Sequence, residues 1–191
     1  MKKKLIIIGA GGHFNSIINI LKSDKNFKII GLLDHDEHKK NKIKFGIKVL
    51  GNDALLKDFT KISIFLSVGL IKNFKQRNNL INKLKKFDFS FPNFKSKNSI
   101  VSENLSQGFG NILMDHCLIN NNVKIGNFNI INNKALIEHD VIIGSNVHIS
   151  TGVLVNGNVK IGSNVFIGSG SIITNNRNIK SNTFIRAGSI I

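Results

Sequence analysis

The sequence of 191 residues has one cysteine, one proline, and neither tryptophan nor tyrosine. The single cysteine, Cys117, excludes an intramolecular disulfide, and with no secretory pattern it predicts a protein of the reducing cytoplasm. No apolar run reaches the roughly 18 residues that a membrane-spanning helix needs, so we expect no membrane span. The start, MKKKLIIIGAGGH, imitates a signal peptide, but its short apolar run ends in glycines and favours a buried strand and a turn.

Acidic residues are also scarce, because 11 Asp and Glu stand against 27 Lys and Arg, a formal net charge of +16. Nineteen of these basic residues lie in residues 1–92. Two interpretations stay open: a proteome rich in lysine and asparagine, or a field that attracts anions such as nucleotide phosphates. Nucleic acid is not expected as a partner, because the basic residues are dispersed and no nucleic-acid-binding motif is present.

Residues 1–92 have the pattern of an α/β domain. Apolar strands are predicted at 4–8, 27–34 and 62–69, with a turn at 9–13 and helices at 14–23, 54–59 and 73–87. Because strands alternate with helices, we expect a small parallel sheet of the Rossmann type.

Residues 93–191 follow a period of six instead. Every sixth residue from Leu113 onward is aliphatic, and the residue two places earlier is usually small or β-branched. This period is the hexapeptide signature of a parallel β-helix, in which three hexapeptides make one triangular coil and the aliphatic residues stack inside. The fourteen predicted inward residues are Leu113, Ile119, Ile125, Ile131, Ile137, Ile143, Ile149, Val155, Ile161, Ile167, Ile173, Ile179, Ile185 and Ile191.

Two stretches depart from this period. Arg177 occupies a position that should hold a small inward residue, so we expect a local bulge or loop there. A linker between the two domains is predicted at 91–102, around the only proline, Pro92.

The repeat also determines where two histidines point. His139 falls at a corner and His148 on a flat side, and the period directs both side chains outward. Nine residues are half a coil, so the two side chains leave in opposite directions and cannot share a site within one chain. Because β-helices of this shape commonly pack as trimers, we expect a site with both histidines only between subunits, repeated three times.

The neighbours of His139 favour acid–base chemistry. Asp140 and Glu138 adjoin it, and a carboxylate near an imidazole fixes the tautomer and increases basicity. Gly157, one coil later, leaves space for a ligand. A metal site is not expected, because the spacing of His116, His139 and His148 does not direct them to one place. Exposed histidines with no task remain an alternative, above all for His148.

The motifs together resemble a known family. They are GAGGH after the first strand, LLD after the second, and IEHDVIIG, VHIS and VNGNVKIGSNVFIGSGS in the repeat. The chain resembles the bacterial sugar acetyltransferases that join a Rossmann-like domain to a left-handed parallel β-helix. Members are the bacillosamine-pathway and perosamine N-acetyltransferases and the sialic acid O-acetyltransferases. The resemblance implies domains at 1–92 and 93–191, acetyl-CoA as co-substrate, and a homotrimer.

The resemblance also implies residue roles. His139 would be the general base, oriented by Asp140. His148 of the neighbouring subunit would contact the thioester, and Gly157, Ser169 and Ala187 would line the CoA channel. The nucleotide part of the sugar would lie on Gly11, Gly12, His13, Asp34 and Gly69. The chain departs from its relatives in having His35 between Asp34 and Asp36, where they carry an acidic pair, and in ending at Ile191 inside the repeat.

The sequence is compatible with three functions. The leading one is acetylation of the amine of a nucleotide-linked 4-amino sugar. The second is O-acetylation of sialic acid or a related nine-carbon sugar acid, which the LIEHD, LVNGNV and GSGSII stretches fit at least as well. The third is a non-catalytic trimeric binding or assembly protein, against which the adjacent His139 and Asp140 argue.

Overall fold

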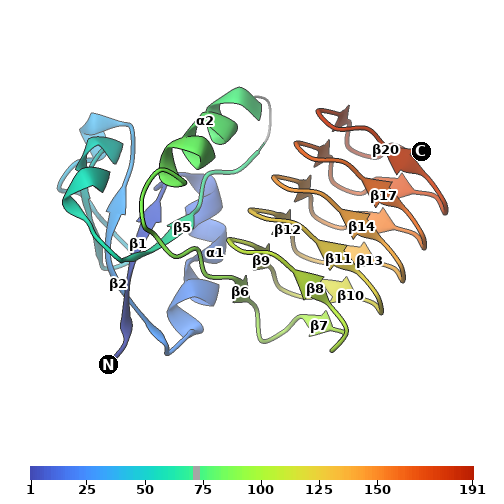
Figure 1. Cartoon of the computed structure of the whole chain (residues 1–191), viewed down its shortest axis with the longest axis horizontal. Helices are drawn as coiled ribbons and strands as arrows, with labels where there is room; N and C mark the ends of the chain where they lie inside the picture. The colour runs from blue at the N-terminus through green and yellow to red at the C-terminus, as the bar shows by residue number, and fades with distance from the viewer. Residues whose placement is uncertain (71–73) are drawn as a thin grey trace. The chain divides into compact units, whose positions relative to one another are not determined.

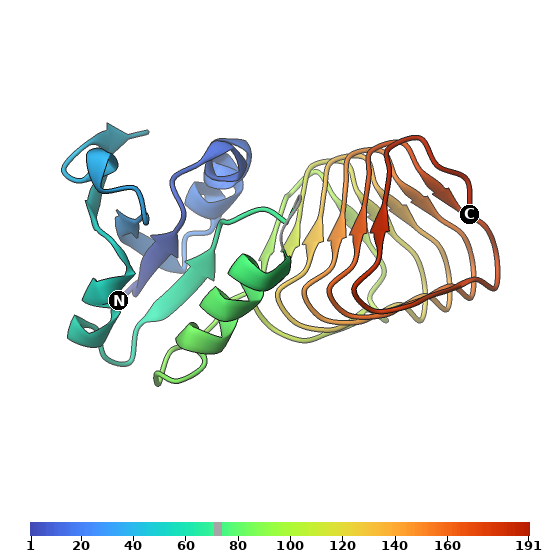
Figure 2. The same ribbon diagram turned by 90° about the horizontal axis from the view of Figure 1, so that it is seen from above.

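The computed structural model describes residues 1–70 and 74–191, and the chain forms two compact units. The N-terminal unit holds Met1–Gly69 and Lys75–Pro92. The second unit includes Leu70 and Asn93–Ile191, and we call it the repeat. Figures 1 and 2 show the sheet and helices of the N-terminal unit in blue to green and the stacked coils of the repeat in yellow to red.

The N-terminal unit is built on a five-stranded sheet of order β3-β4-β2-β1-β5. All its pairs are parallel except β3 with β4. Strand β1 is central, and Leu5–Ile8 are buried because both faces of the sheet are covered. The elements are β1 (Lys3–Ile8), α1 (Gly12–Ser23), β2 (Phe27–Leu33), η1 (Glu37–Lys39), β3 (Ile43–Lys44), β4 (Ile47–Gly51), η2 (Asp53–Asp58), β5 (Ser63–Leu66) and α2 (Phe74–Leu84).

Several predicted elements need correction. Helix α1 begins at Gly12, inside the predicted turn, and η2 is a 3₁₀ helix. Strands β3 and β4 were not predicted, because this hairpin at the sheet edge is partly exposed and lacks a continuous apolar run. The predicted helix at 73–87 is α2, and its first predicted residue lies outside the described residues.

Helix α2 buries an arginine as well as aliphatic residues. Ile81 and Leu84 lie on its buried side, and so does Arg77, at 2% exposure. The Nε atom of Arg77 donates a hydrogen bond of 2.8 Å to the carbonyl of Val68. Burial lowers the pKa of Arg77 to about 9. A charge on the inner side of this helix was not predicted from the sequence.

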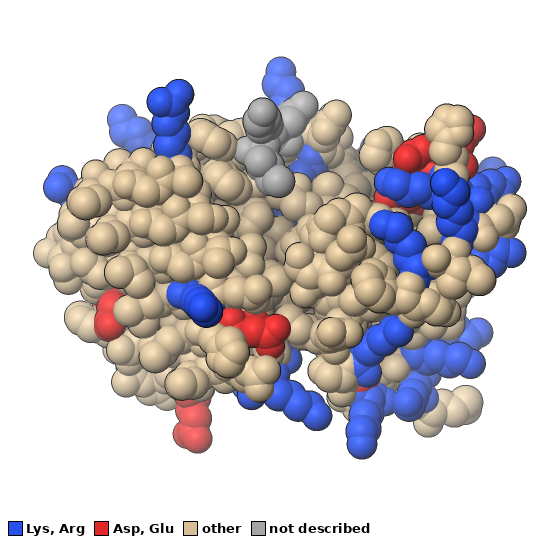
Figure 3. Space-filling view, turned by 180° about the vertical axis from the view of Figure 1, so that it is seen from behind, with Lys and Arg blue, Asp and Glu red and all other residues tan. Residues whose placement is uncertain are grey.

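Lysine and arginine are unequally distributed between the units. In the face that Figure 3 draws, they gather over the N-terminal unit, and the surface of the repeat carries fewer of them. This agrees with the concentration of basic residues in residues 1–92.

The repeat is a left-handed parallel β-helix with three sheets of two-residue strands. Sheet 1 contains β7 (Ile100–Val101), β10 (Leu118–Ile119), β13 (Leu136–Ile137), β16 (Leu154–Val155) and β19 (Ile172–Ile173). Sheet 2 contains β8 (Ser106–Gln107), β11 (Lys124–Ile125), β14 (Ile142–Ile143), β17 (Lys160–Ile161) and β20 (Asn178–Ile179). Sheet 3 contains β6 (Phe94–Lys95), β9 (Ile112–Leu113), β12 (Ile130–Ile131), β15 (His148–Ile149), β18 (Phe166–Ile167) and β21 (Phe184–Ile185).

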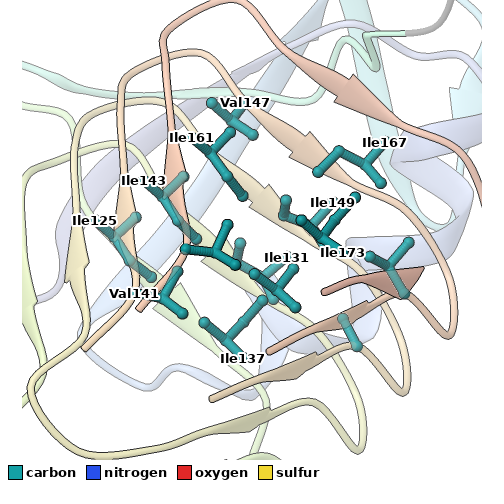
Figure 4. Close-up of a cluster of buried hydrophobic side chains, with 14 of the residues drawn as sticks. Ile125, Ile131, Ile137, Val141, Ile143, Val147, Ile149, Ile161, Ile167 and Ile173 are labelled. Atoms are coloured by element: carbon teal, nitrogen blue, oxygen red, sulfur yellow. The ribbon is translucent and has the colours of Figure 1, made fainter. Parts of the chain in front are cut away.

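The core of the repeat is the predicted aliphatic stack, which Figure 4 shows in part. Thirteen of the fourteen predicted inward residues are buried there, from Leu113 to Ile185. The fourteenth, Ile191, is 39% exposed, because no further coil covers it. The smaller inward positions, such as Ala135 and Val141, fill the remaining space, as a close-packed interior requires.

From Gly110 onward, each corner of the coil places one residue in the left-handed backbone region. The fourteen residues with positive φ at six-residue intervals are Gly110, His116, Asn122, Phe128, Lys134, Asp140, Asn146, Gly152, Asn158, Asn164, Gly170, Asn176, Asn182 and Gly188. Asparagine and glycine predominate because they tolerate this conformation better than other residues. The corners therefore explain part of the asparagine content of the sequence.

Both predicted irregularities of the repeat are wrong. Strands β6 and β7 already belong to the first coil, so most of the predicted linker at 91–102 is part of the β-helix. Arg177 causes no bulge, because β17 and β20 pair in regular register and Lys160 N donates to Arg177 O at 2.8 Å. The Arg177 side chain is exposed and contacts Thr174 Oγ1 instead of filling the core.

Candidate active site

His139 and Asp140 lie at the corner between sheets 1 and 2, in the turn from β13 to β14. We call this edge the 1–2 corner; it holds residues 121–122, 139–140, 157–158 and 175–176. Asp140 has φ 59°, the left-handed conformation of the corner positions. Both side chains are about half exposed.

The two side chains form a hydrogen-bonded pair. His139 Nδ1 lies 2.8 Å from Asp140 Oδ2, and Asn122 Nδ2 donates to Asp140 Oδ1 at 3.2 Å. The bond with His139, followed by the bond from Asn122, holds the pKa of Asp140 below its ordinary value. Because an ionised carboxylate only accepts hydrogen bonds, Nδ1 carries the proton of the neutral ring, and in that form Nε2 has the lone pair that a general base needs.

Gly157 lies directly against the His139 ring. A Cβ atom at Gly157 would be 2.7 Å from His139 Nε2 and 2.8 Å from Cε1. The space that this glycine leaves is therefore taken by the imidazole itself. This refines the expectation that Gly157 leaves room for a ligand, because its missing side chain first makes room for the base.

Glu138, the second carboxylate beside His139, has other partners. Its Oε2 atom accepts a hydrogen bond from Asn120 Nδ2 at 3.0 Å. A second contact, from the His139 backbone N, is longer, at 3.4 Å. Of the two carboxylates that flank the histidine in the sequence, the structure thus places Asp140 against the ring.

His148 points out of the coil, as predicted, but it is not exposed. It lies on the outer face of sheet 3 at 6% exposure, outside the aliphatic core. Its Nδ1 atom is 3.0 Å from the carbonyl of Leu70, Nε2 is 3.4 Å from Asn132 Nδ2, and the ring packs edge-on against Phe166. The outward direction is as predicted, whereas the alternative of an exposed His148 with no task is wrong, because the carbonyl of Leu70, in the same unit, contacts the ring.

The predicted CoA-channel residues divide between two corners. Ser169 and Ala187 lie at the 3–1 corner, which holds residues 115–116, 133–134, 151–152, 169–170 and 187–188. There Ser169 Oγ is 3.0 Å from Ser150 Oγ, and the backbone of Ala187 approaches Gly168 so closely that a Cβ on the glycine would lie 2.3 Å from Ala187 N. Gly157 and His139 lie at the 1–2 corner, across sheet 1 from these residues.

In the N-terminal unit, Asp34 braces the glycine turn after β1. Its Oδ2 accepts from Ala10 N at 2.6 Å, and its Oδ1 accepts from Asp36 N and Lys39 Nζ, both at 3.0 Å. Burial alone raises the pKa of Asp34, but these hydrogen bonds outweigh it and the pKa lies below its ordinary value. Lys44 Nζ donates to Ala10 O at 2.6 Å. Both oxygens of Asp34 are thus engaged within the protein, Oδ2 by the glycine turn and Oδ1 by the segment after β2.

The other predicted substrate residues lie at the carboxyl ends of β1 and β5. Gly11 and Gly12 are exposed, and a Cβ on either would meet no atom within 4 Å. His13 Cβ is 3.8 Å from the position of a Cβ on Gly69. Strands β1 and β5 lie where the strand order reverses, the place where open α/β sheets bind ligands.

Sequence reasoning missed several residues that shape these two places. Ser67 Oγ donates to the carbonyls of Ile8 and Gly9 and so joins the ends of β1 and β5. Lys44 donates to the glycine turn at Ala10 O and Lys39 to the carboxylate of Asp34, and no local pattern distinguishes these two from the other lysines. Asn122 could have been found, because it precedes Asp140 by the 18 residues of one coil.

Within the described residues, no three His, Cys, Asp or Glu side chains are grouped so that they could hold a metal ion. In the same part of the chain, no helix has the length and apolar composition to cross a membrane.

Comparison with solved structures finds the whole two-unit fold in known proteins. The acetyltransferase domain of PglB from Neisseria gonorrhoeae FA1090 has a TM-score of 0.89 and 24% identity over 100% of this chain and 91% of that one. A histidine-to-asparagine mutant of perosamine N-acetyltransferase from Caulobacter crescentus, in complex with CoA and GDP-perosamine, has a TM-score of 0.77 and 23% identity over 96% and 93%. WeeI from Acinetobacter baumannii AYE has a TM-score of 0.72 and 19% identity over 99% and 96%. At these identities the likeness shows the fold.

No curated protein matches the chain by sequence. Two family models do match parts of it. Residues 4–84 match the PglD N-terminal domain, and residues 140–175 match the bacterial transferase hexapeptide, six repeats. The chain thus joins a PglD-type N-terminal domain to a hexapeptide repeat of bacterial transferases, the combination by which it resembles the bacterial sugar acetyltransferases.

Proposed function

We propose that the protein transfers the acetyl group of acetyl-CoA to the amine of a nucleotide-linked 4-amino sugar, with His139 as the general base. The observation that carries this proposal is the His139–Asp140 pair at an exposed corner of a transferase-type repeat. Asp140 fixes the proton on Nδ1, and Nε2 is left as the basic atom. The solved structures of similar fold with acetyl-CoA, or with CoA and GDP-perosamine, support the choice of co-substrate and acceptor class.

The proposed reaction uses the Nε2 atom of His139 twice, first as a base and then as an acid. The amine of the sugar attacks the thioester carbonyl while Nε2 removes a proton from the attacking nitrogen. The new C–N bond forms, the C–S bond breaks, and the proton on Nε2 passes to the departing thiolate of CoA. Asp140 stabilises the imidazolium that exists between these two proton transfers, as an adjacent carboxylate does in other acid–base pairs.

The N-terminal unit is proposed to bind the nucleotide. Gly11 and Gly12 allow a diphosphate to approach the backbone at the start of α1, whose N-terminus favours anions. His13 and Gly69 flank the same end of the sheet. Both oxygens of Asp34 are engaged within the protein. Asp34 is therefore proposed to assist nucleotide binding indirectly, by holding the glycine turn through Ala10.

A homotrimer with shared sites is supported by the outer face of sheet 1. Its outward residues form an aliphatic column, half-buried in the middle and exposed at both ends: Ile100, Leu118, Leu136, Leu154, Ile172 and Ile190. This face separates the 1–2 corner from the 3–1 corner. If three copies pack sheet 1 around a threefold axis, the 1–2 corner of each copy meets the 3–1 corner of the next. His139 of one copy would then face Ser169 and Ala187 of its neighbour, which is the proposed arrangement of the CoA channel.

The test is release of free thiol from acetyl-CoA with a panel of acceptors. We expect release with at least one UDP- or GDP-linked 4-amino sugar, and a product with an amide at that nitrogen by mass spectrometry. Release with free or CMP-linked sialic acids alone would replace amine acetylation by O-acetylation. If no sugar supports release and the protein still binds a sugar nucleotide, the non-catalytic alternative stands instead.

A further inference from the structure

The carboxylate of Asp140 is held from two sides. Its Oδ2 atom meets His139 Nδ1 at 2.8 Å, and its Oδ1 atom accepts a hydrogen bond of 3.2 Å from the side chain of Asn122. Asn122 lies one coil earlier at the same corner, 18 residues before Asp140. A carboxylate fixed at only one oxygen rotates about its Cβ–Cγ bond, whereas one fixed at both presents a constant oxygen to the imidazole.

We propose that Asn122 is a positioning residue for His139, which acts by orienting the carboxylate of Asp140. The proposal rests on the proposed function, because it takes His139 to be the general base. Asn122 itself touches no reacting atom. The order of contacts is Asn122 amide, Asp140 carboxylate, His139 Nδ1, and the basic atom of the pair is His139 Nε2.

The amide ladders elsewhere in the repeat show what is special about Asn122. At the 1–2 corner, Asn158 Nδ2 donates to Asn176 Oδ1 at 2.8 Å, and at the corner between sheets 2 and 3, Asn146 donates to Asn164 at 2.9 Å. Those bonds join neutral amides and stack one coil on the next. The bond from Asn122 has an ionised acceptor, and hydrogen bonds to charged groups are the stronger class.

A second amide on the same coil as Asn122, that of Asn120, bonds the carboxylate of Glu138. Asn120 Nδ2 donates to Glu138 Oε2 at 3.0 Å, two residues from the bond between Asn122 and Asp140. The coil below the site thus gives each flanking carboxylate its own amide. Asn122 directs Asp140 toward the ring, while Glu138 is held by Asn120. The pKa of Asp140, lowered by its bonds with His139 and Asn122, is consistent with this arrangement.

The backbone of the corner provides a matched pair of variants. Asn122 has φ 58° and Asn176 has φ 63°, so glycine fits both positions without backbone strain. Asn122→Gly removes the amide that holds Asp140. Asn176→Gly removes an amide ladder bond at the same corner that has no carboxylate. Asn122→Asp keeps the shape of the side chain and replaces the donor by an acceptor.

Two measurements test the proposal. With the best acceptor of the panel, we expect Asn122→Gly to lower kcat about tenfold with KM values near wild type, the loss of one hydrogen bond to a charged group. Asn122→Asp should lower kcat by at least as much. In ¹⁵N NMR of the His139 ring, Asn122→Gly and Asn122→Asp should each reduce the population of the tautomer with the proton on Nδ1. The control variant Asn176→Gly should leave both kcat and the tautomer population unchanged.

The tautomer measurement separates the two proposals, because it needs no turnover. A wild-type protein that is inactive on every acceptor would contradict the proposed function, and the NMR comparison would still decide the role of Asn122. An Asn122→Gly protein with wild-type kcat and tautomer overturns the inference. So does an Asn176→Gly protein with the same losses, since the effect would then come from the corner in general.

Discussion

The imidazole of His139 lies between Asp140 and Gly157, with Nδ1 2.8 Å from the Asp140 carboxylate and Nε2 over the glycine, where a Cβ would be only 2.7 Å away. One neighbour fixes the proton and the other provides the space for the ring. They reach His139 differently, since Asp140 follows it in the chain and Gly157 lies one coil later.

Replacement of His139 should remove the general base. We expect His139→Asn to lower turnover by roughly 100-fold or more, as loss of a general base typically does. The measurement is steady-state thiol release with the best acceptor. His116→Asn is the control, because His116 is another exposed corner histidine, and its φ of 59° suits asparagine. Equal activity of the two variants would remove His139 from its proposed role.

A methyl group at Gly157 should displace the imidazole. Gly157→Ala has no backbone penalty from positive φ, but its Cβ would collide with the ring at Nε2 and Cε1. Small misplacements of a catalytic group cost up to roughly 100-fold in rate, so we expect kcat to fall by about that factor while the melting temperature changes little. Asn175→Ala, at the equivalent corner position one coil later, should be neutral. Wild-type kcat in Gly157→Ala would show that the ring position does not matter.

A charge on the outer face of sheet 1 should break the proposed trimer. Leu136→Lys together with Leu154→Lys places two cations in the aliphatic column, where an interface would have to desolvate them. We expect light scattering to report monomers and activity to be lost. The control is Asn178→Lys, which adds a cation at an exposed outward position of sheet 2. An active monomer would contradict shared sites.

Asp34 should stabilise the N-terminal unit only when it is ionised. Because its folded-state pKa lies below the ordinary value, its contribution is present above about pH 4 and is lost as pH falls through the folded pKa. Asp34→Asn should lower the free energy of unfolding by about 1–3 kcal/mol at pH 7, and the difference from wild type should shrink toward pH 3. Urea unfolding at both pH values measures this, with the exposed Asp88→Asn as control. A difference independent of pH would exclude the carboxylate as its source.

The two halves of the chain differ in how far their sequence predicts their structure. In the repeat, inward residues recur every six positions and each coil pairs with the next. The local pattern therefore directly predicts which side chains stack in the core. Burial of thirteen of the fourteen predicted residues follows from this. Arg177 was misjudged because a long side chain can leave through a corner toward solvent, and the backbone ladder continues without it.

In the N-terminal unit, the sequence determined the buried strands, because a strand covered on both faces is a continuous apolar run. The sequence did not determine the β3–β4 hairpin or the burial of Arg77. Both depend on how other elements of the unit pack against these segments. The sequence also placed His139 and His148 outside the coil by period alone. Only the tertiary structure decided that Asp140 and not Glu138 meets the ring, that Asn122 holds Asp140, and that Leu70 covers His148. The contacts of Asn122 and Leu70 join residues 18 and 78 positions apart, so no local pattern encodes them. Which of the two carboxylates beside His139 meets its ring depends in turn on side chains one coil away.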